Sequence, residues 1–370
     1  MNRLRVVITG GGTGGHIYPA LAIAAGLFAK AEAQILYIGG RDSLESKLAT
    51  QAGWDFRAIE TSPLHRKSLV LLKDLAANKR GMKQAQKFLL DYQPHLAIGT
   101  GGYASWPVMK AALKLGIPTM IHEQNAVPGL SNKMLAKKVD IICLNFNCAK
   151  ELFSARQRDK IYTTGLPIRP QIMHVDKQKA RDLLKIKSSQ PVFLVTGGSQ
   201  GAQAINNAVA EAWLDLLGGG LQIIHISGAK NYDEVMRKAK AQGLDQSPQL
   251  RIIPYLEHME YGLALADLVL GRAGASFLSE ILCLGIPSIL APYPYAAANH
   301  QLLNAQAVEK AGGAIIIEDK DLHGKSVADA VLNLFADKER MLKMSACASG
   351  LGKPQALDNI IEIALKLIKT

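Results

Sequence analysis

Residues 6–20 read VVITGGGTGGHIYPA. An apolar, β-branched run stops abruptly at a cluster of glycines, and a helical pattern of small and apolar residues follows from Ala20 onward. Glycines allow a ligand or a neighbouring backbone to approach the loop closely, because they have no Cβ. The stretch therefore predicts a strand, a glycine-rich loop and a helix whose N-terminus favours an anionic ligand. His16 is the titratable side chain of this loop.

The loop alone leaves two kinds of nucleotide site open. It fits the dinucleotide fingerprint G-x-G-x-x-G by permissive matching, and it equally suits a nucleotide sugar. A dinucleotide site also needs an acidic residue about twenty positions on, at the end of the second strand. The predicted second strand, residues 34–38, ends in Gly39-Gly40-Arg41, and Asp42 comes late. The rest of the chain has to decide between the two sites.

The composition is that of a globular protein with an anionic partner. The chain has 370 residues, enough for two domains, and a net charge of +12. Such a charge suits nucleic acid, anionic lipid or a phosphorylated substrate, and the sequence contains no nucleic-acid-binding module. The four cysteines form no C-x-x-C pair, which favours a reducing cytosol without disulfides or zinc. With no signal-peptide pattern and no run of about eighteen apolar residues, we expect any membrane contact to be peripheral.

The first half of the chain alternates between strands and helices. Strands are predicted over residues 4–9, 34–38, 95–99, 118–122, 140–144 and 160–163. Alternation of this kind is typical of a parallel sheet with helices on both faces, and ligands bind at the carboxyl ends of its strands. The loops at residues 98–105 and 122–125 follow such ends. We therefore expect both to meet the first glycine loop at one edge of the sheet.

The pattern starts again at residues 191–202, which read PVFLVTGGSQGA. Further strands are predicted over residues 221–227, 250–254, 268–271, 288–291 and 314–317. We predict an N-terminal domain over residues 1–164 and a C-terminal domain over residues 165–352, with a helix in residues 353–370 as a candidate to pack back on the first. The predicted fold is α/β, with two Rossmann-like domains of mainly parallel sheet facing across a cleft. Two such domains speak against an oxidoreductase, which usually has one.

Five motifs occur in order along the chain. They are residues 9–19, 101–105, 122–125 with 129–130, 197–202, and 272–280, after which comes Asn299-His300-Gln301. Together they resemble the MurG-type glycosyltransferases of bacterial cell-wall synthesis, which have the GT-B fold. The resemblance implies an inverting transfer of GlcNAc from UDP-GlcNAc to the C4 hydroxyl of the muramoyl sugar of lipid I. The product is lipid II, which serves peptidoglycan synthesis, cell shape and cell division.

The resemblance implies that the C-terminal domain binds UDP-GlcNAc. Ser199 is expected near the phosphates, at a helix N-terminus, and Leu256 beside the uracil ring. Glu280 matches the ribose-binding carboxylate and Gln301 the residue that reads the GlcNAc hydroxyls. On local sequence alone, both would be solvated helix residues, with Glu280 in a surface ion pair. Ser276 is a candidate helix cap. The donor site is completed by residues of one strand-to-helix junction, whose small members let the nucleotide lie against the backbone: Ala275, Ser276, Phe277, Leu278 and Ser279.

The remaining donor contacts are implied for Asn125, from the first domain, and for Arg169, in the linker. Their local alternatives are a turn-forming residue and a surface ion pair between domains. Thr13, Gly14 and Gly15 are expected to line the substrate site in the first loop. The sequence departs from the family at Ala298, where an acidic residue is common before Asn-His-Gln.

His16 is the candidate for the catalytic base. The acceptor hydroxyl needs a base as it attacks the anomeric carbon, and a helix N-terminus keeps a histidine neutral. The alternative is that His16 only holds the loop or donates to a phosphate. Glu123 is a second candidate, although we expect its carboxylate to be satisfied by N–H groups of residues 101–105. Helix N-termini and loop amides can stabilise departing UDP, so we predict no obligatory metal and no other cofactor.

Residues 64–83, LHRKSLVLLKDLAANKRGMK, are both apolar and basic. Such a composition suits contact with anionic lipid headgroups, and the alternative is a buried helix with solvated lysines. The resemblance favours the membrane, which implies a peripheral enzyme on the cytoplasmic face of the inner membrane, with a cell-wall synthesis complex as a further candidate partner. Two other functions stay open: another GT-B enzyme, such as a glycolipid synthase or a UDP-GlcNAc 2-epimerase, and a non-catalytic, membrane-docked recruiting subunit.

Overall fold

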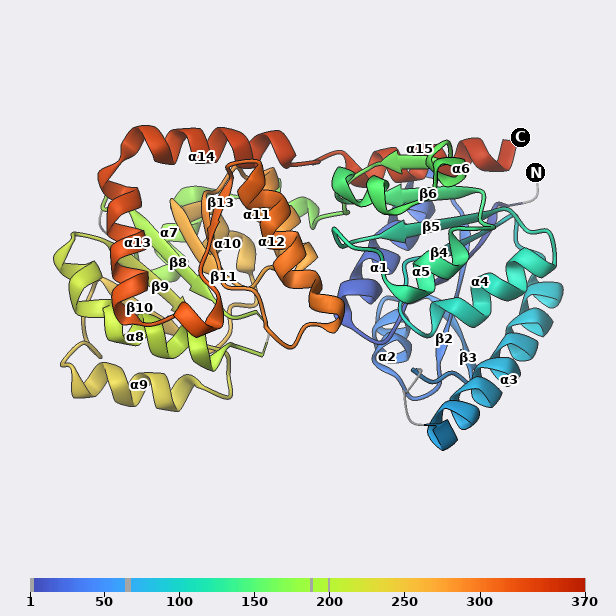
Figure 1. The fold of residues 1–370 in the computed structure, drawn as a ribbon, viewed down its shortest axis with the longest axis horizontal. Helices are drawn as coiled ribbons and strands as arrows, with labels where there is room; N and C mark the ends of the chain where they lie inside the picture. The colour runs from blue at the N-terminus through green and yellow to red at the C-terminus, as the bar shows by residue number, and fades with distance from the viewer. Residues whose placement is uncertain (1–2, 64–67, 187–188, 199, 370) are drawn as a thin grey trace. The chain divides into compact units, whose positions relative to one another are not determined.

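The computed structural model describes residues 3–63, 68–186, 189–198 and 200–369. The chain divides into two compact units (Figure 1). One contains Met1–Ile168 together with Pro354–Thr370, and the other contains Arg169–Lys353. Each unit has a parallel sheet with helices packed against it, so the α/β class predicted for both halves of the chain is confirmed.

The described part of the first unit contains one seven-stranded parallel sheet, in the order β3-β2-β1-β4-β5-β6-β7. The first strand, β1, lies inside this sheet, where Val7 lies opposite Leu36 of β2 on one side and Ala97 of β4 on the other. A return to a central strand followed by growth in the other direction is typical of doubly wound folds. The strands are β1 (Arg5–Thr9), β2 (Gln34–Gly40), β3 (Asp55–Ile59), β4 (Leu96–Gly99), β5 (Thr119–Glu123), β6 (Ile141–Leu144) and β7 (Ile161–Thr163).

Helices cover both faces of this sheet, as the fully buried side chains of β1 show. Successive residues of a strand point to opposite faces. Accordingly, Val6 and Ile8 pack in a core that includes residues of α1 and α15, whereas Val7 packs in a second core with residues of α3 and α4. The helices of this unit are α1 (Gly14–Ala31), α2 (Leu44–Gln51), α3 (Ser68–Tyr92), α4 (Ser105–Lys114), α5 (Leu130–Leu135), α6 (Ala155–Arg158) and α15 (Ala356–Lys369).

The C-terminal helix α15 belongs to the first unit, although the whole second unit precedes it in sequence. It packs against α1, and Ile360, Ile361 and Ala364 are buried there. The helices approach each other closely at Gly26, where a Cβ would lie 2.5 Å from the Cδ1 of Ile361. The apolar face of α15 therefore completes the core on one side of the first sheet.

The second unit repeats the architecture, and its described residues contain a six-stranded parallel sheet in the order β10-β9-β8-β11-β12-β13. Trp213 and Phe193 are its largest fully buried side chains. The strands are β8 (Val192–Thr196), β9 (Gln222–Ile226), β10 (Leu250–Ile253), β11 (Leu268–Gly271), β12 (Ser288–Leu290) and β13 (Ala314–Ile316). The helices are α7 (Lys177–Leu184), α8 (Gln203–Gly218), α9 (Tyr232–Ala241), α10 (Met259–Leu265), α11 (Ala275–Cys283), α12 (His300–Lys310), α13 (Gly324–Ala336) and α14 (Lys338–Leu351).

The sequence prediction missed one strand, β3. In this edge strand, Asp55 and Arg57 are exposed, Phe56 and Ala58 are partly buried, and Ile59 is fully buried. The strands inside this sheet, β1, β2, β4, β5 and β6, are covered on both faces and read as apolar runs, which made them recognisable. Asp55 and Arg57 interrupt the apolar pattern of β3, which is why the sequence did not predict this strand.

Two glycines inside helices give a matched test of the packing of α3. A Cβ on Gly81 would lie 1.8 Å from the backbone oxygen of Glu60, whereas a Cβ on Gly350 in α14 would meet nothing within 4 Å. Because a backbone oxygen cannot swing aside, we expect Gly81→Ala to destabilise the protein by roughly 1–3 kcal/mol. Gly350→Ala should leave the stability unchanged or raise it slightly, since alanine favours helix. Urea unfolding midpoints would check this, and equal midpoints for the two variants would contradict the packing described.

Candidate functional site

Three loops meet at the carboxyl edge of the first sheet, as the sequence predicted for the loops after β1, β4 and β5. The backbone N–H of Gly11 donates to the carbonyl of Gly101 at 3.3 Å, which joins the two glycine loops. The hydroxyl of Thr100 donates to the carbonyl of His16 at 2.7 Å. Gln124, after β5, donates to the carbonyl of Thr100 at 2.8 Å. The three loops are therefore one hydrogen-bonded assembly.

The N-terminus of α1 is presented at this edge. Thr13 is the N-cap residue, with extended backbone, and its side chain makes no capping hydrogen bond. Gly12 before it has a φ of +86°, a left-handed conformation that suits glycine. The first N–H groups of a helix have no partner within the helix. Thr13, Gly14 and Gly15 therefore offer backbone donors to a ligand at the surface.

His16 lies in the first turn of α1 and is half-buried. Its Nδ1 lies 3.1 Å from the carbonyl oxygen of Thr100 and 3.0 Å from Oε1 of Gln124. Both neighbours are acceptors, so Nδ1 carries the ring proton and Nε2 of the neutral ring keeps its lone pair. Within the described residues, Nε2 has no hydrogen-bond partner. The geometry thus provides a nitrogen that can accept a proton.

Glu123 is held by a different loop from the one predicted. Its carboxylate accepts from the N–H groups of Asn125 and Gly129, at 3.1 and 3.0 Å, and from Nδ2 of Asn132, at 2.8 Å. The expectation that residues 101–105 satisfy this carboxylate is therefore wrong. Glu123 braces the turn that follows its own strand, and Asn125 also donates its side-chain amide to Glu123 at 3.3 Å. The turn reaches back to the strand end because Gly129 and Asn132 open α5.

The sequence prediction also missed Glu45, whose buried carboxylate is hydrogen-bonded to the first glycine loop. This carboxylate is fully buried and accepts from the N–H groups of Gly12 and Gly40, at 3.3 and 3.1 Å. Tyr37 donates to the carbonyl of Gly10, and burial together with Glu45 raises the pKa of Tyr37. The signal available in the sequence was weak: Ser43 caps α2 and Glu45 lies in its first turn, which is common at helix starts.

In the second unit, a glycine loop joins β8 to α8 in the same way. A Cβ on Gly197 would lie 2.2 Å from the backbone nitrogen of Ala202, and Gly198 has a φ of +83°. Only glycine fits both positions without strain. Ser199, the residue expected near the phosphates, lies outside the described residues.

The other strand-to-helix junction of this unit starts α11. Its N-cap residue is Gly274, and no side chain caps the helix, so the expectation that Ser276 is the cap is wrong. Ser276 lies two positions beyond the N-cap residue, inside the first turn of the helix. Leu278 is fully buried and Ser279 donates to the carbonyl of Ala275, so these two side chains face the protein interior. The more accessible members of the predicted set are Ser276 and Phe277.

Glu280 follows on α11 and pairs with Arg169. The guanidinium donates from Nε and Nη2 to the two carboxylate oxygens, at 3.0 and 3.2 Å. Nη1 of Arg169 also lies 3.6 Å from Glu260, whose other oxygen is 3.0 Å from Nδ1 of His258. Burial raises the pKa of Glu280, although Arg169 acts in the opposite direction. Arg169 and both of its partners belong to the second unit, so the alternative of an ion pair between domains is wrong.

Leu256 and Gln301 complete the predicted donor residues. Leu256 is half-buried in the loop between β10 and α10. Gln301 lies in the first turn of α12, and its Oε1 accepts from the N–H of Tyr293 at 2.9 Å. The two residues before α12, Ala298 and Asn299, have left-handed backbone with φ of 51° and 56°. Asparagine tolerates that conformation better than alanine does, so the left-handed backbone suits Asn299 better than Ala298.

The described part of the chain contains no group of three or more His, Cys, Asp or Glu side chains placed to hold a metal ion. The chain has one Asp-x-Asp sequence, Asp319-Lys320-Asp321. Asp319 is paired with the guanidinium of Arg272, which leaves this carboxylate engaged. That the reaction needs no metal stays a prediction.

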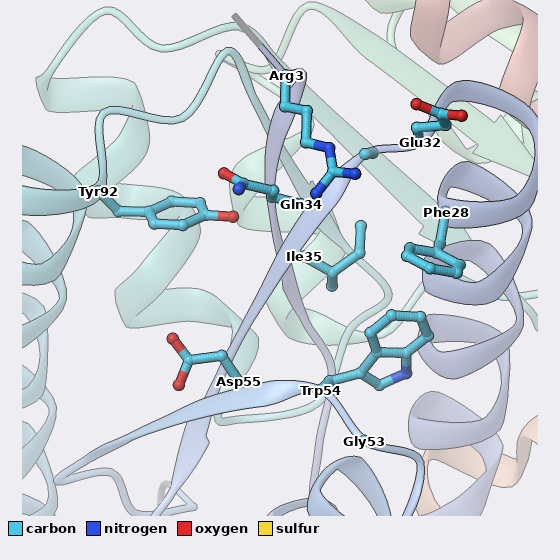
Figure 2. Close-up of a pocket in the computed structure, with 10 residues that line it drawn as sticks. Arg3, Phe28, Glu32, Gln34, Ile35, Gly53, Trp54, Asp55 and Tyr92 are labelled. Carbon is cyan, nitrogen blue, oxygen red and sulfur yellow. The ribbon is translucent and has the colours of Figure 1, made fainter.

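A pocket of about 340 Å³ lies at the opposite, amino edge of the first sheet (Figure 2). Phe28 and Trp54 form one wall, edge to face, with ring centroids 5.7 Å apart. Tyr92 lies across from them, and burial raises its pKa to about 12. Because the strands begin at this edge, the pocket is separate from the loops that carry His16.

Known protein families and curated relatives match both halves of this chain. Residues 6–143 match the model of the glycosyltransferase family 28 N-terminal domain, and residues 192–360 match that of its C-terminal domain. A protein from Halothermothrix orenii is 45% identical over 97% of this chain and 98% of its own length. One from Desulforamulus reducens is 42% identical over 99% of each chain. Both are named UDP-N-acetylglucosamine–N-acetylmuramyl-(pentapeptide) pyrophosphoryl-undecaprenol N-acetylglucosamine transferase.

Solved structures show the same fold. Acinetobacter baumannii MurG matches with a TM-score of 0.77 at 23% identity, over 99% of this chain and 100% of that one. A UDP-N-acetylglucosamine 2-epimerase described as putative, from Listeria monocytogenes, matches with a TM-score of 0.73 at 14% identity, over 100% and 98%. The fold is therefore shared by two kinds of enzyme, and the sequence relatives distinguish between them. The chain belongs to glycosyltransferase family 28 and, within it, to the MurG family.

Proposed function

We propose that the protein is an inverting glycosyltransferase that transfers GlcNAc from UDP-GlcNAc to the C4 hydroxyl of the muramoyl sugar of lipid I, forming lipid II. The observation that carries this proposal is the agreement with a named GlcNAc transferase at 45% identity over 97% of the chain. The site geometry is compatible with it, because the first unit offers a base and the second offers a largely buried carboxylate on α11, the helix that follows β11.

In the proposed reaction, Nε2 of His16 takes the proton of the acceptor hydroxyl. The hydroxyl oxygen attacks the anomeric carbon from the face opposite to UDP, a new C–O bond forms, and the bond to the diphosphate oxygen breaks. The electron pair of that bond leaves with UDP. Because the attack comes from the opposite face, the α-linked donor gives a β-linked product. Loop N–H groups and the N-terminal ends of α8 and α11 would stabilise the negative charge of UDP. No protein nucleophile takes part.

We assign donor binding to the second unit and acceptor binding to the first. Glu280 would accept hydrogen bonds from the ribose hydroxyls, since a carboxylate has more acceptor sites than Arg169 occupies. Gln301 would donate a hydrogen bond from its side-chain Nε2 to the sugar, because its Oε1 already accepts from the N–H of Tyr293. Leu256 would border the uracil, and the backbone of residues 275–279 the nucleotide. Asn125 and Arg169 are the further donor contacts that we propose.

The decisive experiment measures UDP release with UDP-GlcNAc and a lipid I analogue. We expect release that depends on the acceptor. Epimerisation of UDP-GlcNAc without acceptor would instead assign the chain to the other enzyme class that has this fold. Tight UDP binding without turnover on any lipid-linked acceptor would favour a recruiting subunit.

We further propose that α3 docks on the cytoplasmic face of the inner membrane. Val70, Leu72 and Leu75 are exposed on this helix, at 39%, 65% and 49%. Lys73, Lys79, Arg80 and Lys83 are exposed beside them, whereas Asp74 and Asn78 are buried. Exposed leucines among basic residues suit an interface with anionic lipid. Of the predicted stretch, residues 64–67 lie outside the described residues, and no described helix is long and apolar enough to cross a bilayer.

Replacing Leu72 and Leu75 together by aspartate should weaken binding to phosphatidylglycerol vesicles by at least about tenfold, because apolar area is lost and negative charge is added. Vesicle co-sedimentation would measure this. The matched control is Leu214→Asp with Leu342→Asp, which alters two leucines of the second unit that are 58% and 72% exposed. Equal binding by the two double variants would contradict docking through α3. Binding to a cell-wall synthesis complex stays a prediction.

A further inference from the structure

The hydrogen bonds of His16 continue into the first unit through Gln124, which is 1% exposed. Its Nε2 lies 2.8 Å from the carbonyl oxygen of Thr100 and 3.1 Å from that of His122. Carbonyl oxygens only accept, so the nitrogen side of the amide must face them. The reverse orientation would press Oε1 against two oxygens. Oε1 of Gln124 is therefore the atom that faces Nδ1 of His16, at 3.0 Å.

His122 forms the next contact, and its own tautomer is determined in the same way. The ring is fully buried on β5, with Nε2 at 2.8 Å from the carbonyl oxygen of Gly165 and Nδ1 at 3.1 Å from Nε2 of Gln124. Nε2 must carry the proton, because Gly165 offers only an acceptor. Nδ1 then accepts from Gln124. Burial lowers the pKa of His122, which keeps this ring neutral.

We propose that Gln124 and His122 are positioning residues that fix the Nδ1–H tautomer of His16, so that Nε2 is the nitrogen available to the acceptor hydroxyl. The proposal rests on the role of His16 in the proposed function. The chain of contacts begins at Gly165 and ends at His16, and each of its hydrogen bonds has one permitted direction. All of its members lie in the first unit.

The chemical benefit comes from the choice between two tautomers. An unconstrained neutral imidazole exchanges between them, and a ring with its proton on Nε2 cannot accept another proton there. With Nδ1–H held by Gln124 and Thr100, the ring can take the acceptor proton on Nε2 without any hydrogen bond reversing. The two oxygens at Nδ1 also stabilise the imidazolium that forms. Thr100 alone would hold the ring less firmly, since Gln124 supplies one of the two acceptors.

The test is the tautomer itself, observed by long-range ¹H–¹⁵N NMR correlation in the substrate-free protein, with assignments from His16→Ala and His122→Phe. In the wild type we expect a protonated Nδ1 and an unprotonated Nε2 for His16, and the opposite pattern for His122. Gln124→Leu and His122→Phe should each move His16 toward a mixture of tautomers. A protonated Nε2 on neutral His16 in the wild type, or an unchanged His16 spectrum in both variants, would overturn the proposal. The wild-type spectrum decides even if a variant fails to fold.

The matched control is His225→Phe, which alters a fully buried histidine of the second unit that is bonded to Asn206. It should leave the His16 spectrum unchanged. In the UDP-release assay, Gln124→Leu should lower kcat by roughly ten- to a hundredfold, with the KM for UDP-GlcNAc unchanged. A parallel loss in KM for the donor would indicate a merely structural role. If the wild type released no UDP, the proposed function would fail, while the spectra would still decide the tautomer.

Discussion

His16→Ala is expected to lower kcat by roughly 10²- to 10⁴-fold, the usual contribution of a general base. The physical reason is the position of Nε2, which is the proton-accepting nitrogen because Nδ1 faces two oxygens. The dissociation constant of UDP-GlcNAc should stay nearly the same, since we assign donor binding to the other unit. Steady-state UDP release and an independent titration of UDP-GlcNAc would measure the two effects separately.

A matched control for this prediction is His174→Ala, which removes an exposed histidine of the second unit. This variant should retain the wild-type kcat. The backbone carbonyl of His16 also accepts a hydrogen bond from the Thr100 hydroxyl. Alanine preserves this backbone contact, so the loop should keep its conformation. Equal losses of donor affinity and turnover in His16→Ala would contradict the assigned roles, and would favour a histidine that contacts the phosphates.

The strands and glycine loops were predictable because their signals are local. A β-branched run that stops at glycines reports a buried strand and a tight connection within a few residues, and Val6 to Gly12 carries both signals. The final helix was predicted within residues 353–370, and α15 covers Ala356–Lys369, because apolar residues recur along it at helical spacing. By contrast, β3 was missed because Asp55 and Arg57, on the exposed face of this edge strand, interrupt the apolar run.

The connections within the site were not predictable, because they join residues that are distant in sequence. His16 meets Thr100 and Gln124 across 84 and 108 positions, and no local pattern reports such a pairing. Glu45 looked like an ordinary first-turn acidic residue, but it supports Gly12 from 33 positions away. Motif resemblance can nominate His16 or Glu280. It does not say which hydrogen bonds orient them.

Glu280→Gln is expected to raise the dissociation constant of UDP-GlcNAc by roughly 10- to 100-fold, equivalent to roughly 1.5–3 kcal/mol for the loss of hydrogen bonds to a charged group. The carboxylate is 12% exposed, so its desolvation has already occurred in the folded protein. Ribose hydroxyls would therefore gain strong acceptors without further desolvation of the site. Isothermal titration would measure the dissociation constant, and kcat at saturating donor should change much less.

The alternative is that Glu280 only holds Arg169 and does not bind the ribose. The variant Glu260→Gln distinguishes between these two roles. Glu260 is equally buried and pairs with the same guanidinium, at 3.6 Å, but is not a predicted ribose ligand. We expect this variant to stay within about threefold of the wild-type affinity, because its ion pair with Arg169 is long and its contact with the exposed His258 is one that a glutamine can also make. Equal losses in both variants would show that the ion pair, and not ribose binding, explains the effect of Glu280.

A second readout follows from the raised pKa of Glu280. Donor affinity should fall as the pH drops through a value above the ordinary carboxyl pKa of 4.5, and this fall should be absent in Glu280→Gln.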